Sequence, residues 1–360
     1  MPPSAPDPHY LTMRIAQVAP LFESCPPRLY GGTERVVSYL TEQLVADGHD
    51  VTLFASRDSR TGARLVPGAP QALRLSGGHS SPGVWHTLML ERVARYADQF
   101  DLIHFHTDYL HLPLTRRLRV PTISTLHGRL DLTEVAALYS EFAEVPVVSI
   151  SDSQRTPLPG ANWVATVYHG IPVDRYALGP GDGGYLAFLG RISPEKRPDL
   201  AIRIAHEAGM ELRMAAKVDA ADRAYFEDEI RPLLDAPNVS LIGEIGEKEK
   251  GEFLGRAAAM LFPIDWPEPF GLVMIEAMAC GTPVIAFPRA SVPEVVDHGL
   301  TGYLVGGIGE AIQAVRHLRS FDRARCRATF EARFSAQRMA QDYLGVYHAV
   351  AAAAASRGPL

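Results

Sequence analysis

The chain has 360 residues, of which 47% are hydrophobic and 21% charged, and its formal net charge at pH 7 is −6. This length and composition are those of a soluble globular protein with room for two domains of ordinary size. The acidic balance argues against a nucleic-acid partner, which needs a basic face, and against a strong membrane signal, although it leaves peripheral association open.

Cysteine usage and hydropathy indicate the compartment. Cys25, Cys280 and Cys326 are odd in number and far apart, so neither a disulfide framework nor a zinc-ligand spacing is visible. No uninterrupted apolar stretch has the length of a membrane-spanning helix, and residues 1–13 lack the pattern of a secretion signal. We therefore expect a cytoplasmic protein.

The first half of the chain has the order of a βαβ unit. A short apolar run at 13–20 predicts a strand, residues 31–47 have helical spacing, and 51–55 predict a second strand. Residues 56–83 are rich in Gly, Pro and Ser and are expected to form a long loop. Three more strands are expected, at 102–105, 122–125 and 147–150.

The alternation of strands and helices restarts after residues 169–184, which are rich in Gly and Pro and are interpreted as a linker. Strands are expected at 185–189, 211–215, 240–242, 259–263, 283–287 and 302–305, with helices near 199–208, 248–258 and 270–280. Two helices then end the chain, the last at about 335–355. The predicted fold class is α/β, with two Rossmann-like, doubly wound domains that face each other across a cleft.

The segment PEPFGLVMIEAMACGTPVIAF, residues 267–287, carries a lone acid, Glu276, inside an apolar run. A buried carboxylate is costly unless it accepts strong hydrogen bonds, and a vicinal diol such as a ribose supplies two of them. Pro269 and Gly271 lie where a helix is expected to begin, and a helix N-terminus favours anions. The plainer interpretation is a core Glu paired with an Arg, and Glu268 by itself is an acid near a helix start.

Two cations follow a predicted strand in LGRISPEKRPDLAI, residues 189–202. Arg191 and Lys196 at such a strand end suit a diphosphate, Arg through its bidentate fork and Lys as a point charge. The alternative is a solvated charged loop.

Glycines open the first helix in RLYGGTERVV, residues 28–37. Gly31 and Gly32 would let backbone approach a phosphate or a sugar closely, unless they form a simple helix cap. The stretch GGIGEAI at 306–312 lacks the third Gly of a dinucleotide-binding loop and is interpreted as a helix start.

Histidines end two predicted strands. His127 follows the strand at 122–125 and is expected to face the cleft, where it could bond a substrate or be an ordinary loop residue. The run HFHTD at 104–108 suggests a metal, but no further ligand lies at a matching spacing, and a strand end that lines the cleft is the favoured interpretation.

Together these segments resemble the retaining glycosyltransferases of family four, which have the GT-B fold. The resemblance covers nearly the whole chain and is most specific in EPFGLVMIE, where Glu268 and Glu276 form E-x7-E, followed by AMACGTPVIAF and SVPEVVDHGLTGYLV. In the first half it is carried by YGGTERVVSYLTEQLVADGHDVTLFAS and by His127. It implies domains at 1–174 for the acceptor side and 175–334 for the donor, with residues 335–360 as a helix that returns to the first domain, and a tail.

The resemblance also implies roles for the individual residues. Glu276 would hold the ribose of a nucleotide sugar, Glu268 the hydroxyls of its sugar, and His127 its C6 hydroxyl. Arg191 and Lys196 would hold the diphosphate, together with Gly31, Gly32 and the backbone N–H groups of Phe270, Gly271, Leu272 and Val273. The implied catalytic set is Glu268, Arg191, Lys196 and His127, and acceptor-side residues are expected at His106, Asp108 and Arg129. No metal and no cofactor are implied, because the nucleotide sugar is a co-substrate.

The implied reaction is transfer of a hexosyl group from a UDP-sugar or GDP-sugar to the hydroxyl of a glycan, a lipid-linked or a small-molecule acceptor. Three other functions stay open. A glycoside hydrolase would use Glu268 and Glu276 as its carboxylate pair but has no need of the cations at 191 and 196. A nucleotide-sugar epimerase would work without an acceptor, and a non-catalytic sugar-nucleotide binding protein would bind without turnover.

Overall fold

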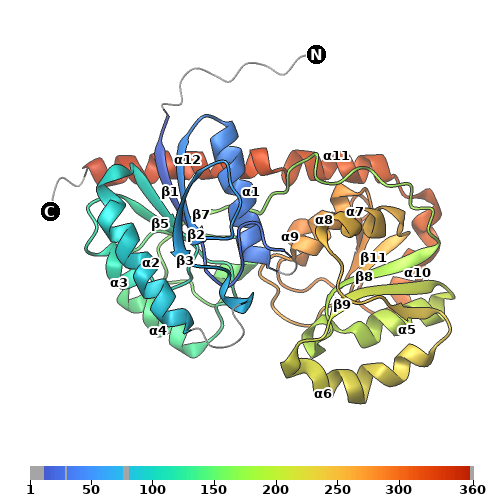
Figure 1. Ribbon diagram of the computed structural model, residues 1–360. Helices are drawn as coiled ribbons and strands as arrows, with labels where there is room; N and C mark the ends of the chain where they lie inside the picture. The colour runs from blue at the N-terminus through green and yellow to red at the C-terminus, as the bar shows by residue number, and fades with distance from the viewer. Residues whose placement is uncertain (1–11, 29–30, 76–80, 357–360) are drawn as a thin grey trace, which may run out of the picture.

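The computed structural model describes residues 12–28, 31–75 and 81–356, which form two α/β units side by side (Figure 1). Each unit is built on one sheet in which every paired strand is parallel. The first sheet has the spatial order β3-β2-β1-β4-β5-β6-β7 and the second β10-β9-β8-β11-β12-β13. Both orders reverse beside their first strand, and this reversal is the place where doubly wound sheets bind ligands. The predicted fold class is thus confirmed.

The strands are short, and the central ones are apolar because helices cover both faces of each sheet. In the first sheet they are β1 (Arg14–Val18), β2 (Asp50–Ser56), β3 (Arg64–Ala69), β4 (Leu102–Phe105), β5 (Thr122–Thr125), β6 (Val147–Ser149) and β7 (Trp163–Thr166). In the second they are β8 (Tyr185–Arg191), β9 (Glu211–Lys217), β10 (Val239–Leu241), β11 (Ala259–Phe262), β12 (Val284–Ala286) and β13 (Gly302–Leu304).

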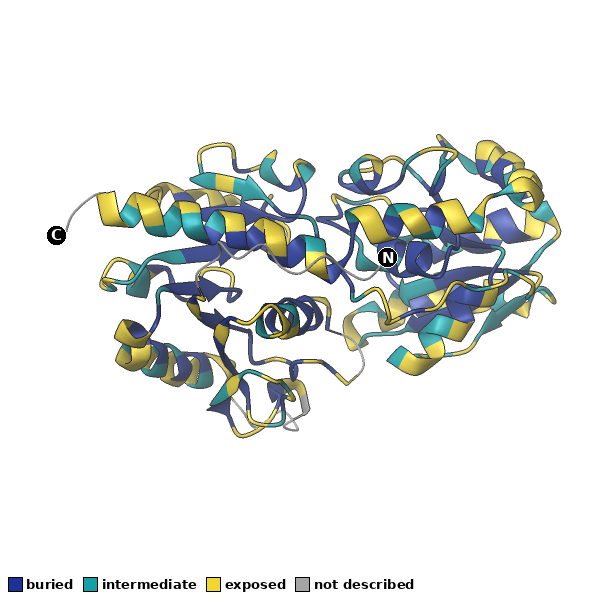
Figure 2. Ribbon diagram, turned by 90° about the horizontal axis from the view of Figure 1, so that it is seen from above, coloured by how far each residue is buried: buried dark blue, intermediate teal, exposed yellow. Residues whose placement is uncertain are grey.

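The α-helices pack around the sheets with their outer faces exposed and the strands buried beneath them (Figure 2). In the first unit they are α1 (Gly32–Ala46), α2 (Pro82–Tyr96), α3 (Leu112–Thr115) and α4 (Thr133–Glu141). In the second they are α5 (Pro198–Ala208), α6 (Arg223–Tyr225), α7 (Glu247–Arg256), α8 (Leu272–Ala279), α9 (Val292–Val295), α10 (Ile308–His317) and α11 (Arg323–Arg333), and the chain continues into α12 (Ala336–Ser356).

The expected long loop at 56–83 was wrong in part. It contains β3, and α2 begins at Pro82. Pro67 and Gly68 hid the strand from the sequence pattern, but β3 lies at the edge of its sheet, where a proline costs no ladder bond. The strand β7 was also not predicted, and the helix expected at 270–280 begins two residues later, so that Pro269 precedes it.

The chain crosses between the units twice, and the two crossings touch. Ile171, in the linker after β7, exchanges backbone hydrogen bonds of 2.9 Å with Phe334 and Ala336, between α11 and α12. A Cβ on Gly170 would lie 2.3 Å from the carbonyl oxygen of Ser335, so only glycine permits this approach. The last helix therefore returns to the first unit, where α12 packs on α1 and β5 (Figure 1).

Candidate active site

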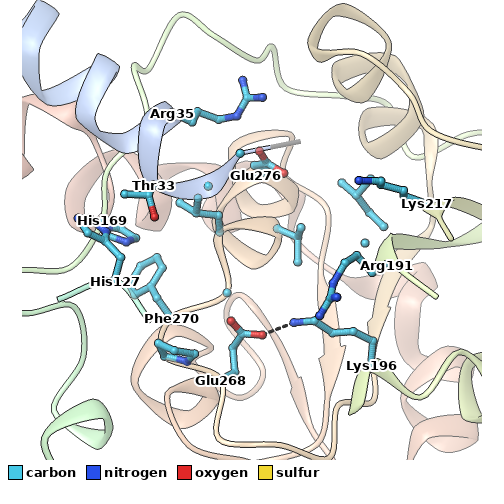
Figure 3. A pocket seen from close by; sticks show the side chains of 18 of the residues that line it. Thr33, Arg35, His127, His169, Arg191, Lys196, Lys217, Glu268, Phe270 and Glu276 are labelled. Carbon is cyan, nitrogen blue, oxygen red and sulfur yellow. Dashed lines mark hydrogen bonds and ion pairs between the residues drawn. The ribbon is translucent and has the colours of Figure 1, made fainter. Parts of the chain in front are cut away.

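A cleft with a volume of about 460 Å³ lies between the two units, where the carboxyl ends of both sheets meet (Figure 3). One wall comes from α1 and the loops after β5 and β7, and the other from α8 and the loops after β8 and β9. Direct contacts join the units beside the cleft. Ser151 donates a hydrogen bond of 2.7 Å to the carbonyl of Pro269, and the carboxylate of Glu294 accepts the N–H groups of Asp152 and Ser153 at 2.7 Å each.

Glu276 lies in α8 with 2% of its surface exposed, and its side chain borders the cleft. Its Oε1 accepts a hydrogen bond of 2.8 Å from Lys250 Nζ in α7. Its Oε2 is buried, and no donor among the described residues reaches it. A buried, unsatisfied carboxylate oxygen is expensive, so this atom is placed for a ligand donor rather than for the core.

Lys250 ties this carboxylate to the other unit. Lys250 Nζ lies 3.8 Å from a carboxylate oxygen of Glu247, which is also paired with Arg35 of α1. Burial by itself would raise the pKa of Glu247, but the charges of Lys250 and Arg35 lower it below its usual value. The expected core alternative, a Glu paired with an Arg, is wrong for Glu276 itself, whose partner is Lys250.

The start of α8 faces the cleft. Gly271, its N-cap, has φ of 84°, and a Cβ there would lie 2.7 Å from Met274 Cε, so this turn requires glycine. Leu272 and Val273 are half-buried and border the cleft. The side chain of Phe270 instead packs edge-on against His169, with ring centroids 4.8 Å apart. Phe270 therefore borders the cleft with a side chain that is almost fully buried.

Glu268 and Lys196 form an ion pair on the same wall of the cleft as the start of α8 (Figure 3). The indole Nε1 of Trp266 also donates to Glu268, at 3.0 Å, and Lys196 Nζ lies 4.8 Å from the centre of the Trp266 ring. Glu268 is 9% exposed, so the pair is largely shielded from water. The family resemblance assigns these two residues to different groups of the substrate, and nothing in the sequence predicts that they bind each other.

Arg191 ends β8 and is surrounded by carboxylates. It donates to Glu195 at 2.7 Å and lies 3.5 Å from both Asp219 and Asp222. Lys217, at the end of β9, lies 2.7 Å from Asp219 and also borders the cleft. An anion that binds here must therefore compete with acidic side chains for these cations.

The glycine pair lies at the N-terminus of α1, on the first unit. Gly31 has φ of 153°, and a Cβ there would lie 2.8 Å from Pro27 Cβ. A Cβ on Gly32 would lie 3.4 Å from Leu272 Cδ1, across the cleft at the start of α8. The two helix starts thus face each other at close range, as the expected backbone approach requires.

His127 follows β5 and borders the cleft, as expected. Its Nε2 lies 2.9 Å from His106 Nδ1, and its Nδ1 is buried without a partner among the described residues. Burial lowers the pKa of His127 to about 3, so the ring is neutral at physiological pH. His169 stacks on it with ring centroids 5.4 Å apart (Figure 3), and its own Nδ1 likewise has no partner in the part of the chain that the structure describes.

The expected acceptor-side residues separate. Asp108 and Arg129 border the cleft, and Arg129 forms a bidentate pair with Asp131 at 2.6 and 2.7 Å. His106 does not border it. The placement expected for His106 was wrong, because its side chain, directly after β4, is 1% exposed and packs in the interior between Gln17 and His127.

Several residues of the cleft were missed. Lys250 and His169 have no local pattern that marks them, because the partners Glu276 and His127 are distant in the sequence, and Lys217 was missed although its partner Asp219 lies two residues later. Glu34 had a signal, as an acid two residues after the glycine pair. It is 5% exposed, its Oε1 accepts the N–H of Glu23 at 3.2 Å, and burial raises its pKa. In the described ranges no three His, Cys, Asp or Glu side chains are grouped to hold a metal ion.

Comparison with known proteins decides the family. A model of glycosyl transferases group 1 matches residues 175–325, and a model of glycosyltransferase family 4 matches residues 30–175. The chain belongs to glycosyltransferase family 4. It is similar to the D-inositol 3-phosphate glycosyltransferases of Mycobacterium bovis and Mycobacterium tuberculosis, with 27% identity over 267 residues, which cover 61% of this chain. The chain matches about half the length, 54%, of these curated relatives.

Solved structures agree with the GT-B fold of this family 4 member. The glycosyltransferase AviGT4 of avilamycin A biosynthesis is 23% identical, with a TM-score of 0.73 over 94% of this chain and 98% of that one. The Anabaena protein HepE, solved with UDP and glucose, is 19% identical, with a TM-score of 0.72 over 93% of this chain and 99% of that one. Among the described residues, no helix combines the length and the apolar character needed to cross a membrane.

Proposed function

We propose that the protein is a retaining, metal-independent hexosyltransferase that moves a sugar from a nucleoside-diphosphate donor to an acceptor hydroxyl. The observation that carries the proposal is Oε2 of Glu276, a buried carboxylate oxygen at the edge of the cleft that accepts no hydrogen bond from the described part of the chain. A ribose offers two neighbouring hydroxyl donors to such a carboxylate. The ion pair with Lys250 engages Oε1 and leaves Oε2 for a ligand.

The cations at the ends of β8 and β9 support a diphosphate beside this ribose. As the glycosidic bond breaks, negative charge grows on the leaving phosphate, and fixed positive groups in a closed cleft stabilise it. Arg191, Lys196 and the N-terminus of α8 supply such charge. The incoming phosphates would take over Arg191 from its carboxylate partners and Lys196 from Glu268, which frees Glu268 to accept hydroxyls of the sugar.

No side chain of the cleft is assigned as a covalent nucleophile. Glu268, the acid beside the proposed sugar position, is engaged by Lys196 and Trp266. We infer that the acceptor attacks from the face that the phosphate leaves, and that a phosphate oxygen takes the acceptor proton. The configuration at the anomeric carbon is then retained, and His127 bonds the sugar through Nδ1.

The donor is proposed to be a UDP-sugar, since HepE was solved with UDP and with UDP-glucose; a GDP-sugar is the alternative. The acceptor is proposed to enter from the first unit, past Asp108 and Arg129. It requires a free hydroxyl, whether on a glycan, a lipid-linked or a small-molecule acceptor.

A thermal-shift panel of UDP, GDP, ADP and NAD tests the donor site. A ligand at a hundred times its Kd should add about 2.7 kcal/mol to the free energy of unfolding. One nucleoside diphosphate should shift the melting temperature, and its hexose conjugate should be turned over with an acceptor panel to a product of retained anomeric configuration by NMR. A shift with NAD alone would contradict the proposal. Epimerised donor in the absence of acceptor would identify an epimerase.

A further inference from the structure

A line of buried polar side chains runs from the C-terminal helix to the cleft. Tyr347 of α12 bonds the side chain of Gln17 in β1, Gln17 bonds His106 directly after β4, and His106 bonds His127. The three contacts measure 3.0, 2.8 and 2.9 Å. Tyr347 and Gln17 have no exposed surface and His106 is 1% exposed, so no water competes for these bonds.

The atoms in this line determine where the protons lie. Gln17 donates from Nε2 to the Tyr347 hydroxyl, so its Oε1 faces His106 Nε2. An amide oxygen only accepts, so His106 carries its proton on Nε2 and leaves Nδ1 as an acceptor. His127 must then donate from its own Nε2, and its Nδ1 is left with a lone pair. That Nδ1 is one of the buried atoms at the edge of the cleft for which the structure, over its described ranges, shows no hydrogen-bond partner.

Were the Gln17 amide reversed, every step would reverse. His106 would accept from Gln17 and donate to His127, and His127 Nδ1 would carry a hydrogen instead of a lone pair. In the observed orientation the hydroxyl of Tyr347 accepts from Nε2 and donates to His104 Nδ1, 2.8 Å away, whereas in the reversed orientation it would donate to Oε1 and accept from His104 Nδ1. Burial keeps both His104 and His106 neutral, because it lowers their pKa values well below the usual range.

We propose that Tyr347 is a positioning residue for the transferase site, which acts through Gln17 and His106 to fix His127 in the tautomer that accepts a sugar hydroxyl at Nδ1. The inference rests on the proposed function, since it assigns His127 to the donor sugar. It gives the returning helix α12 a part in the reaction. The first unit binds the sugar correctly only when this helix is seated against β1 and β4.

The chain offers a matched control in Tyr343, one turn earlier in α12. It is equally buried and its hydroxyl is bonded to Thr125 Oγ1 at 2.9 Å. Thr125 contacts His104 at 2.7 Å, and His104 contacts the Tyr347 hydroxyl at 2.8 Å, so this line joins Tyr343 to the Gln17 amide only through Tyr347. Tyr347→Phe and Tyr343→Phe therefore remove the same group from the same helix, and only the first removes the partner of the Gln17 amide.

The first experiment is NMR of the full chain labelled with 15N-histidine, with the His127 signals assigned by their loss in His127→Gln. The wild type and Tyr343→Phe should show His127 protonated at Nε2 and bare at Nδ1. Tyr347→Phe should show the other tautomer or an exchange-averaged pair. Wild-type His127 with its proton on Nδ1, or an unchanged tautomer in Tyr347→Phe, would overturn the inference. If Tyr347→Phe does not fold, Gln17→Met replaces it with the same expected result.

The second experiment separates the sugar from the nucleotide. Tyr347→Phe should lower kcat/KM for UDP-glucose by about tenfold, the effect of one hydrogen bond, and leave the Kd of UDP within about twofold. The effect should disappear with UDP-xylose, which lacks the C6 hydroxyl. Equal losses for UDP and UDP-glucose, or equal effects of Tyr347→Phe and Tyr343→Phe, would overturn the inference. Failure of the wild type to bind any nucleoside diphosphate would instead refute the proposed function, and the tautomer measurement would still stand.

Discussion

Glu276→Gln isolates the charge of the proposed ribose ligand at almost unchanged volume. A carboxylate offers two acceptor oxygens to two hydroxyls, whereas an amide offers one and turns its other atom into a donor. One hydroxyl loses its acceptor, at about 2 kcal/mol, and the other loses the assistance of charge, at about 1 kcal/mol. A loss of about 3 kcal/mol weakens the Kd of UDP by more than about a hundredfold.

A thermal-shift assay measures this directly. At a UDP concentration a hundred times the wild-type Kd, the wild type gains about 2.7 kcal/mol, but a variant whose Kd equals that concentration gains only about 0.4 kcal/mol. Without UDP, the variant should unfold within about 1 kcal/mol of the wild type. The variant loses the negative charge that is paired with Lys250, but it also loses the cost of burying a charged oxygen that has no donor among the described residues. Lys250 still has Glu247 as a partner, at 3.8 Å.

Glu268→Gln is the matched control, since it makes the same chemical change in the other acid of the cleft. It should preserve the shift with UDP and reduce the affinity for UDP-hexose. If Glu276→Gln retains the full UDP shift, the assignment of Oε2 to a ribose is refuted, whatever the activity of the variant.

Three further predictions concern the phosphate site, the turn before α8 and the buried histidines. Arg191→Met should weaken UDP by at least about tenfold and leave uridine binding unchanged in calorimetry; an equal loss for uridine would contradict the diphosphate role. Gly271→Ala should lower the free energy of unfolding more than Gly243→Ala, because both glycines have φ of 84° but only the first would bring a Cβ within 2.7 Å of Met274. The left-handed backbone strain that both alanine variants share costs about 1–2 kcal/mol. Equal denaturation midpoints for the two variants would contradict the prediction, since they would show that the contact with Met274 is relieved. Since burial lowers the pKa of His127 to about 3, the unfolded chain binds a proton there below pH 6.5 that the folded chain does not. Each such histidine therefore removes about 1.4 kcal/mol of stability per pH unit as the pH falls towards 4, and His127→Gln should make that slope shallower in denaturant titrations at several pH values.

Local sequence determined the elements and the residues that end them. Alternating apolar strands and helices required two parallel sheets, and residues that follow a strand or start a helix in such sheets reach the same edge. This is why Glu276, Arg191 and His127 could be placed at one cleft before any contact was known. The edge strand β3 was not predicted, because Pro67 and Gly68 argue against a strand unless it is known to lie at the edge of its sheet.

Tertiary structure alone decided which side chains meet. The acid Glu276 needed a cation, and nothing in its neighbourhood shows that Lys250, 26 residues earlier, would supply it to one oxygen only. Gln17 and Tyr347 are 330 residues apart, and they touch only because α12 returns to the first sheet. The spacing of apolar residues along the sequence indicates which face of a helix or strand is buried. A hydrogen bond depends instead on the positions of two atoms that the whole fold brings together. The same dependence explains why the sequence predicts His106 to line the cleft, whereas in the structure it lies behind His127.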